Sequence, residues 1–290
     1  MTEKEYKKID QRILSHLPGR ISRSNKGTYG KVLCVAGSLN MAGAAYLCAW
    51  AAYRAGAGLV RVLTPMENRV ILQTLLPEAL LTTFDAGNPQ PAKIREAFDW
   101  ADVSAVGPGL GRESWAYELT RMAVTEFQKP LVLDADGLNH LSEHMELLKE
   151  RKGELILTPH PGEFARLTGQ GIAEVAADIP GQAVRFSKVH GCICVLKDAP
   201  TAVGDGAGEV YVNTTGNNGM STGGSGDVLA GIIAGLAAQK TPPLPAALLG
   251  VWLHGRAGDL AAEREGTYGM MARHLVEYLP KAMNRELREG

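Results

Sequence analysis

The sequence is poor in cysteine, and its cysteines are not spaced for metal binding. Only four occur in 290 residues, Cys34, Cys48, Cys192 and Cys194, and no two of them form a C-x2-C pair. Zinc sites use such pairs, and small secreted proteins use a denser set of disulfides. The pattern argues against both classes and predicts buried thiols in a reducing cytoplasm.

An excess of charge of either sign is also missing. The chain carries 30 lysines and arginines against 31 aspartates and glutamates, without a long run of either kind. This balance argues against nucleic acid or an anionic membrane as a partner. We therefore expect small-molecule partners.

No apolar stretch is suited to export or to membrane insertion. Residues 1–18 are charged and have helical periodicity, without the apolar region of a signal sequence. The alanine-rich segment 42–60 contains Arg54, and its apolar stretches are too short to span a bilayer. These features predict a cytoplasmic protein with no membrane partner.

No repeat, low-complexity tract or linker divides the chain, and we expect a single domain over residues 1–290. Large α/β domains reach this size. Segments of helical periodicity alternate with short apolar runs, at 31–37, 59–64, 101–106, 130–134 and 154–158. The alternation predicts an α/β fold with a mostly parallel central sheet and helices on both faces. Residues 191–214 differ, because two β-like runs flank a turn at 205–208, which predicts a β-hairpin at one edge of the sheet.

The two commonest phosphate-binding motifs are absent. The sequence has no G-x-x-x-x-G-K-[ST], and "GPGLG" at 107–111 does not complete G-x-G-x-x-G. The protein is therefore neither a P-loop protein nor an ordinary dinucleotide-binding Rossmann protein.

A glycine-rich stretch is present instead, "TTGNNGMSTGGSGDVLAG" at 214–231, and it leads into an apolar helical segment. A helix start exposes unpaired N–H groups and the positive end of the helix dipole, and glycines let an anion approach the backbone. We predict a phosphate-binding anion hole formed by Gly223, Gly224, Ser225 and Gly226.

Asp227 directly follows this predicted anion hole. It could cap the helix, or it could accept a proton from a hydroxyl that attacks a phosphoryl group. The helix dipole and the nearby N–H groups favour the anion, so we expect Asp227 to be ionised at neutral pH.

Five motifs occur in the order found in one known family. "TGGSGDVLAG" resembles the signature of the ribokinase-like superfamily, whose aspartate is the catalytic base. Together with "GKVLCVAGSLNMAGAAYLCAWAAYRAGAGLV", "VGPGLG", "LDADGLN" and "LTPHPGEFARL", the chain resembles the ADP/ATP-dependent (S)-NAD(P)H-hydrate dehydratases of the stand-alone bacterial type, from about residue 26 to 274.

This resemblance implies a ribokinase-like fold and a nicotinamide nucleotide repair activity. The S epimer of hydrated NADH or NADPH would be dehydrated at the expense of ADP or ATP, with Mg²⁺. Phosphorylation of the hydroxyl and elimination of phosphate would make the enzyme a carbon-oxygen lyase. Family members are often homo-oligomers, so the resemblance also implies a homo-oligomer.

The resemblance also assigns residues. Asp227 would be the catalytic base, and the contacts to the hydrated substrate would be Ala44, Gly109, Gly111, His160 and Asp227. The nucleotide would be bound by Lys197, Asp198, Ala199, Pro200, Thr201 and Gly226.

Two loops depart from the family pattern. Asp198 replaces a glycine in the nucleotide loop "KDAPT", and the last loop is "GNNGM" where GNPGM is common. We expect the Asp198 side chain to point outward, because an inward carboxylate would repel phosphate.

Some ionisable residues remain without a definite role. Asp134 and Asp136 end a strand as a close carboxylate pair, which suggests magnesium bound through water or a helix cap, and the metal ligands stay unassigned. His254 lies in a helical segment and is interpreted as a packing residue.

Two other functions share the Asp227 turn. A ribokinase-like kinase for a vitamin-precursor alcohol would release a stable phosphorylated product, and a nucleotide sensor would bind without catalysis. The loops "PHPGE" and "GSLNMAGAA" favour the dehydratase over the kinase, and the presence of Asp227 argues against the sensor.

Overall fold

The computed structural model describes residues 6–284. A ten-stranded sheet runs through these residues in the order β1-β10-β9-β8-β7-β6-β5-β2-β3-β4. The strands are β1 (Lys7–Ile9), β2 (Lys31–Val35), β3 (Leu59–Pro65), β4 (Leu80–Phe84), β5 (Val103–Val106), β6 (Leu131–Leu133), β7 (Leu155–Leu157), β8 (Ile193–Leu196), β9 (Thr201–Gly204) and β10 (Val210–Asn213). Only β9 runs antiparallel to its neighbours, so the predicted mostly parallel sheet is confirmed.

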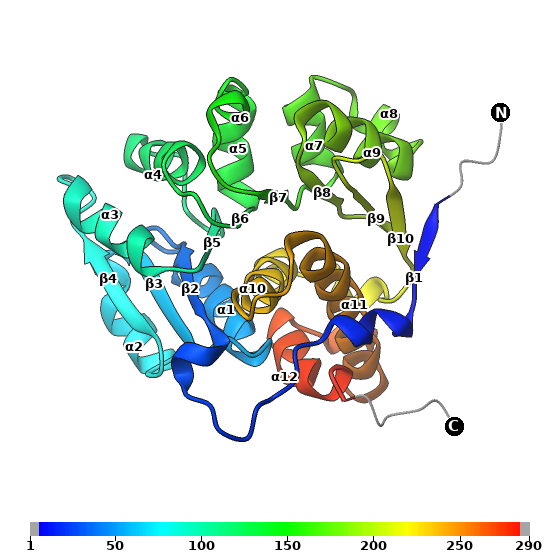
Figure 1. Cartoon of the computed structure of the whole chain (residues 1–290), viewed down its shortest axis with the longest axis horizontal. Helices are drawn as coiled ribbons and strands as arrows, with labels where there is room; N and C mark the ends of the chain where they lie inside the picture. The colour runs from blue at the N-terminus through cyan, green and yellow to red at the C-terminus, as the bar shows by residue number, and fades with distance from the viewer. Residues whose placement is uncertain (1–5, 285–290) are drawn as a thin grey trace.

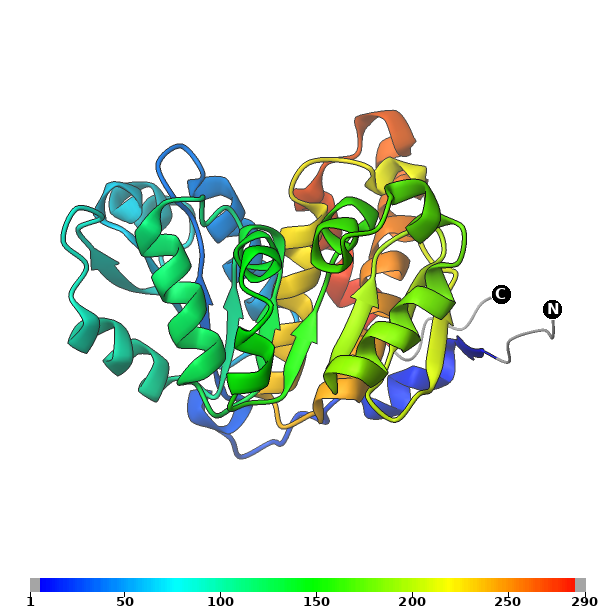
Figure 2. The same cartoon turned by 90° about the horizontal axis from the view of Figure 1, so that it is seen from above.

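Helices cover both faces of the sheet, as the alternation predicted (Figures 1 and 2). One face carries α1 (Ala42–Arg54), α2 (Arg69–Leu75), α10 (Ser225–Ala238), α11 (Pro243–Gly269) and α12 (Ala272–Ala282). The other face carries α3 (Pro91–Trp100), α4 (Ser114–Thr125), α5 (Ala135–Glu143), α6 (Leu147–Glu150), α7 (Pro161–Thr168), α8 (Ile172–Ala176) and α9 (Ile179–His190). None of the helices in this part of the chain is both long and apolar enough to cross a bilayer.

The predicted hairpin is present, but it is not the edge of the sheet. The strands β9 and β10 pair in antiparallel register, and β1 adds to β10 in parallel. The helical periodicity of residues 1–18 does not produce an α-helix in the part that the structure describes, because residues 7–9 form this strand and Gln11–His16 form the 3-10 helix η1. Pairing with β10 supplies hydrogen bonds that local periodicity cannot predict. The rest of the prediction, residues 1–5, lies outside the described residues.

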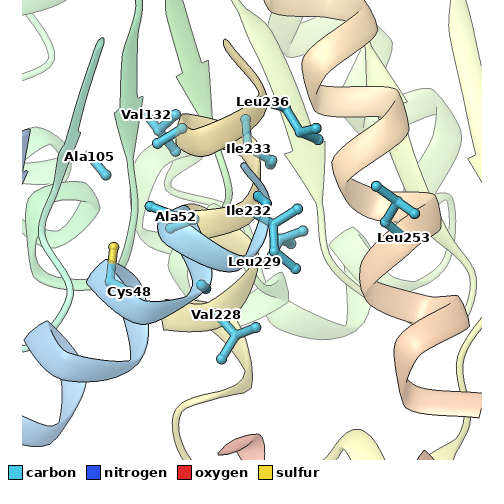
Figure 3. Packing of buried hydrophobic residues seen from close by; sticks show 14 of the residues in the cluster. Cys48, Ala52, Ala105, Val132, Val228, Leu229, Ile232, Ile233, Leu236 and Leu253 are labelled. Carbon is cyan, nitrogen blue, oxygen red and sulfur yellow. The ribbon is translucent and has the colours of Figure 1, made fainter. Parts of the chain in front are cut away.

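Small residues allow α1 and α10 to pack closely in the core. A Cβ at Gly231 would collide with the carbonyl oxygen of Cys48, and one at Gly235 would press on the carbonyl oxygen of Ala52. Figure 3 shows the two helices side by side, with Ala52 of α1 near Ile232 and Ile233 of α10. The packing fixes the axis of α10, so that its N-terminus lies at the carboxyl ends of the parallel strands.

Candidate functional site

A cleft of about 860 Å³ opens at the carboxyl ends of β6, β7, β8 and β10, where open α/β sheets bind ligands. The starts of α10 and α7, the loop between β8 and β9, and one face of α11 form its walls. Its lining brings together many residues predicted from the sequence: His160, Lys197, Asp198, Ala199, Pro200, Thr201, Ser225, Gly226 and Asp227.

The first turn of α10 leaves backbone N–H groups free at the cleft. Its N-cap is Gly224, with φ +91°, and no side chain caps the helix. The amide of Ser225 donates to the carbonyl of Thr222 at 3.3 Å, whereas the amides of Gly226 and Asp227 have no intrahelical acceptor. These two N–H groups and the helix dipole favour a phosphate oxygen at this point.

A buried ion pair lies next to this turn. Lys197 Nζ donates to Asp134 Oδ1 at 2.8 Å, and Thr158 Oγ1 donates to the same oxygen at 2.7 Å. A Cβ at Gly226 would lie 3.2 Å from Lys197 Nζ and 3.4 Å from Asp134 Oδ2. The ammonium group therefore lies beside the helix start, and the missing side chain of Gly226 leaves room for it.

Asp227 has no hydrogen-bond partner among residues 6–284, so it does not cap α10. Burial raises its pKa to about 7, and the negative charge of Asp134 adds to this effect while Lys197 opposes it. The expectation of an ordinary, fully ionised Asp227 at neutral pH is therefore not supported, because its pKa is raised from 3.8 into the neutral range. Desolvation and a like charge outweigh the helix dipole.

His160 caps α7 and thereby fixes its own tautomer. Its Nδ1 accepts from the amides of Gly162 at 3.0 Å and Glu163 at 3.3 Å, so the proton of the neutral ring is on Nε2. Burial and the charge of Lys197 lower the pKa of His160, which favours this neutral form. Nε2 lies 3.4 Å from Glu163 Oε1 and is the ring atom that carries a proton for donation.

Glu163 is buried behind this cap. Its Oε2 accepts from the amide of His160 at 2.8 Å and lies 3.8 Å from Lys197 Nζ. Burial raises the pKa of Glu163, although Lys197 opposes the shift. Although burial lowers the pKa of Lys197, attraction to Asp134 and Glu163 raises it above its ordinary value, so the lysine stays charged.

The loop between β8 and β9 forms one wall of the cleft. The hydroxyl of Thr201 donates to the carbonyl of Asp198 at 2.9 Å, and the carboxylate of Asp198 accepts from the amide of Ala199 at 2.8 Å. Asp198 is exposed but also lines the cleft. Its outward orientation therefore stays a prediction.

Three of the predicted substrate contacts lie outside the lining of this cleft. A Cβ at Gly109 would lie 2.7 Å from Cβ of Ala44, so these two residues touch each other. The amide of Gly111 donates to Asp136 Oδ2 at 2.8 Å. The structure thus places Ala44, in the first turn of α1, beside Gly109 in the loop after β5, which also contains Gly111.

The suggested metal pair is not supported by the structure. Asp134 binds Lys197 and Thr158, whereas Asp136 accepts from Gly111 and from Asn139 at 3.2 Å. The two carboxylates therefore serve different loops. Within residues 6–284, no group of three histidine, cysteine, aspartate or glutamate side chains is placed to hold a metal ion.

Two residues of α11 support the site in ways that the sequence did not suggest. His254 Nε2 lies 3.0 Å from the carbonyl oxygen of Ser225, and burial lowers its pKa to about 4, so the neutral ring donates to the start of α10. Asp259 accepts from the amide of Gly216 and from Asn217 Nδ2, both at 3.1 Å. Sequence analysis missed both links because each joins segments at least 29 residues apart.

Comparisons with known proteins agree with this geometry. A family model described as NAD(P)H-hydrate dehydratase matches residues 32–281. The ADP-dependent (S)-NAD(P)H-hydrate dehydratase of Neisseria meningitidis is 40% identical over 253 residues, which cover 85% of this chain and 82% of that protein. The bifunctional NAD(P)H-hydrate repair enzyme of Moorella thermoacetica is 43% identical over 285 residues, which cover 95% of this chain and 53% of that protein. The chain thus spans about half the length of this bifunctional relative.

A solved structure has the same fold. The ADP/ATP-dependent NAD(P)H-hydrate dehydratase of Bacillus subtilis, co-crystallised with ATP and Mg²⁺, is 30% identical and superposes with a TM-score of 0.83, over 96% of this chain and 98% of that one. The predicted ribokinase-like α/β fold is confirmed, since a ribokinase-like protein of Enterococcus faecalis also matches with a TM-score of 0.84. The chain belongs to the NAD(P)H-hydrate dehydratase family.

Proposed function

We propose that this protein dehydrates the S epimer of hydrated NADH or NADPH and uses ADP or ATP as the phosphoryl donor. One observation carries the proposal: an unpartnered carboxylate, Asp227, with a pKa of about 7, stands at an open helix N-terminus beside the buried ammonium of Lys197. Phosphoryl transfer to a hydroxyl needs a general base, here with a pKa near 7, and a site that binds the transferred phosphoryl group.

The proposed reaction begins with phosphoryl transfer. The substrate hydroxyl loses its proton to Asp227 while its oxygen attacks the terminal phosphorus, and the bond from phosphorus to the nucleotide oxygen breaks. The first-turn amides of α10 and the ammonium of Lys197 stabilise the charge on the transferred group. Donors of this kind are each worth about 3 kcal/mol.

Elimination follows from the chemistry of the phosphorylated hydrate. The lone pair of the adjacent ring nitrogen expels phosphate as the carbon-oxygen bond breaks. Loss of a ring proton then restores the dihydronicotinamide. His160 lines the same cleft and, as an Nε2–H donor, would bind an acceptor on either ligand.

Mg²⁺ is proposed to enter with the nucleotide. The side chains of residues 6–284 form no three-ligand cluster, and Asp134 already accepts two hydrogen bonds. Magnesium commonly takes most of its ligands from substrate phosphates and water. The relative from Bacillus subtilis was co-crystallised with ATP and Mg²⁺, which supports a nucleotide-borne ion.

The deciding experiment supplies hydrated NADH, Mg²⁺ and either ADP or ATP, and follows the absorbance of reduced nicotinamide and the release of phosphate. We expect one phosphate for each NADH recovered, and no recovery without nucleotide. A stable phosphorylated product without NADH would identify a kinase. Nucleotide binding without turnover would identify a sensor.

Three broader expectations remain proposals. A single domain is supported by the one sheet that runs from β1 to β4. A cytoplasmic location is supported by four buried thiols, none of them in a disulfide. A homo-oligomer is supported by large apolar side chains exposed on and beside α2: Met66, Val70, Ile71 and Leu75. Light scattering measures the last of these directly.

A further inference from the structure

A second cavity lies behind the cleft. It has a volume of about 400 Å³, opens to the surface, and is lined by residues of β1, η1, α11 and the end of α12. The segment Thr214–Thr215 lines both this cavity and the cleft, so one stretch of backbone separates them. In Figure 1, η1 lies against α11, the helix that also carries His254.

Arg256 of α11 lines this cavity and carries a planar guanidinium group. The residue is partly buried, and its guanidinium makes no hydrogen bond or ion pair within residues 6–284. Lys8 and Lys281 add positive charge at the cavity edge. An arginine that loses part of its hydration without gaining a partner is costly, so an outside acceptor would be favoured.

The acidic groups of the cavity are already engaged. Asp10 forms an ion pair with Arg12 at 2.6 Å. Asp259 accepts hydrogen bonds from Gly216 and Asn217, which line the cleft, both at 3.1 Å. Neither carboxylate contacts Arg256, so the guanidinium is free to bind an incoming anion.

We propose that this cavity binds a small anion of the phosphate class through Arg256. The planar guanidinium matches two phosphate oxygens at once, and the cavity has room for a di- or triphosphate-sized ion. Asp259 lies three residues after Arg256 on α11 and accepts the hydrogen bonds of Gly216 and Asn217, which line the cleft. The bound anion and the nucleotide would therefore lie on either side of the same segment. The site therefore couples anion binding to nucleotide affinity.

The test separates the two anion sites. Pyrophosphate is titrated calorimetrically into protein saturated with ADP, which fills the first site. We expect one pyrophosphate per chain, with affinity weakened about tenfold or more by Arg256→Gln and kept in part by Arg256→Lys. The matched control is Arg185→Gln, because Arg185 is an exposed arginine paired with Asp178 on α9, outside the cavity.

A second arm does not depend on the proposed function. In the Lys197→Met variant without ADP, pyrophosphate should still bind once per chain, and Arg256→Gln should remove that binding. Coupling is read from the ADP affinity with and without pyrophosphate, in the parent and in Arg256→Gln. Pyrophosphate binding that is unaffected by Arg256→Gln, or absent in both arms, overturns the proposal whether or not the protein proves to be a dehydratase.

Discussion

Lys197 Nζ donates to Asp134 Oδ1 at 2.8 Å, although the two residues are 63 positions apart in the sequence. The pair lies beside Gly226, where a side chain would touch both of its members. Burial is the largest cause of the raised pKa of Asp227; the charge of Asp134 adds to it and that of Lys197 opposes it, so this ion pair modulates the protonation of the proposed base. Several predictions about the site depend on this relationship.

Replacing Asp227 with asparagine removes the proposed base and keeps the shape of the side chain. We expect kcat to fall by about 10²–10⁴ while nucleotide affinity stays the same or improves slightly. Single-turnover recovery of NADH and calorimetric binding of ADP measure the two effects. Turnover within a few-fold of the parent would show that Asp227 is not the base.

The pH dependence of the parent enzyme should report the same group. Asp227 acts only when deprotonated and has a pKa of about 7, so kcat/KM should rise with pH through 7 and level off above it. The Asn variant should lack this step. A flat parent profile between pH 6 and 8 would contradict the assignment.

The same substitution should stabilise the fold in a pH-dependent way. The pKa of Asp227 is raised from 3.8 to about 7, so the folded state binds the proton more tightly, and this contribution to stability is lost as pH rises through 7. Asp227→Asn should therefore be more stable than the parent at pH 8, by up to about 4 kcal/mol at about 1.36 kcal/mol for each pH unit between 3.8 and 7, and nearly equal at pH 4. Urea denaturation of both proteins at pH 4 and pH 8 measures this difference in stability.

Replacing one member of the ion pair should lower the free energy of unfolding more than replacing both members. Lys197→Met leaves the carboxylate of Asp134 buried without its cation, and we expect a loss of about 3–5 kcal/mol of stability. The double variant with Asp134→Asn should recover most of that loss but no activity. Equal stability of the single and double variants would mean that the pair is already well solvated.

Two glycines of α10 provide a matched test. A Cβ at Gly226 faces Lys197 and Asp134 in the site, whereas one at Gly231 meets the backbone of Cys48 in the core. Gly226→Ala should lower kcat/KM with little change in the melting temperature, and Gly231→Ala should cost about 1–3 kcal/mol of stability. The opposite pattern would mean that Gly226 serves packing.

His254 should act as a positioning residue for the anion site. His254→Phe removes the donor to the carbonyl of Ser225, so we expect weaker nucleotide binding and no change in the pH profile. His254→Asn, which can still donate, should recover part of the affinity. Equal nucleotide KM in both variants would limit this residue to packing, as its sequence context had suggested.

The sequence by itself determined the architecture and the family. Alternating apolar runs and helical segments fix a parallel α/β sheet, because each pattern matches only one backbone period. Glycines before an apolar helix, followed by Asp227, predicted an anion site with a carboxylate beside it, and the structure, in the part of the chain that it describes, leaves free N–H groups and an unpartnered carboxylate at that position. These features are local, since they lie within single loops and their adjoining helix.

Tertiary structure alone decided which distant groups meet and how they are charged. The pairing of Lys197 with Asp134 and the strand formed by residues 7–9 depend on the order of strands in the sheet. The contact of His254 with Ser225 depends on the packing of α11 against α10. The pKa of Asp227 could not be predicted locally, because burial and a carboxylate 93 residues away outweigh the helix dipole beside it. Electrostatic effects depend on distance in space and on exclusion of water, and neither quantity can be obtained from the positions of residues in the sequence.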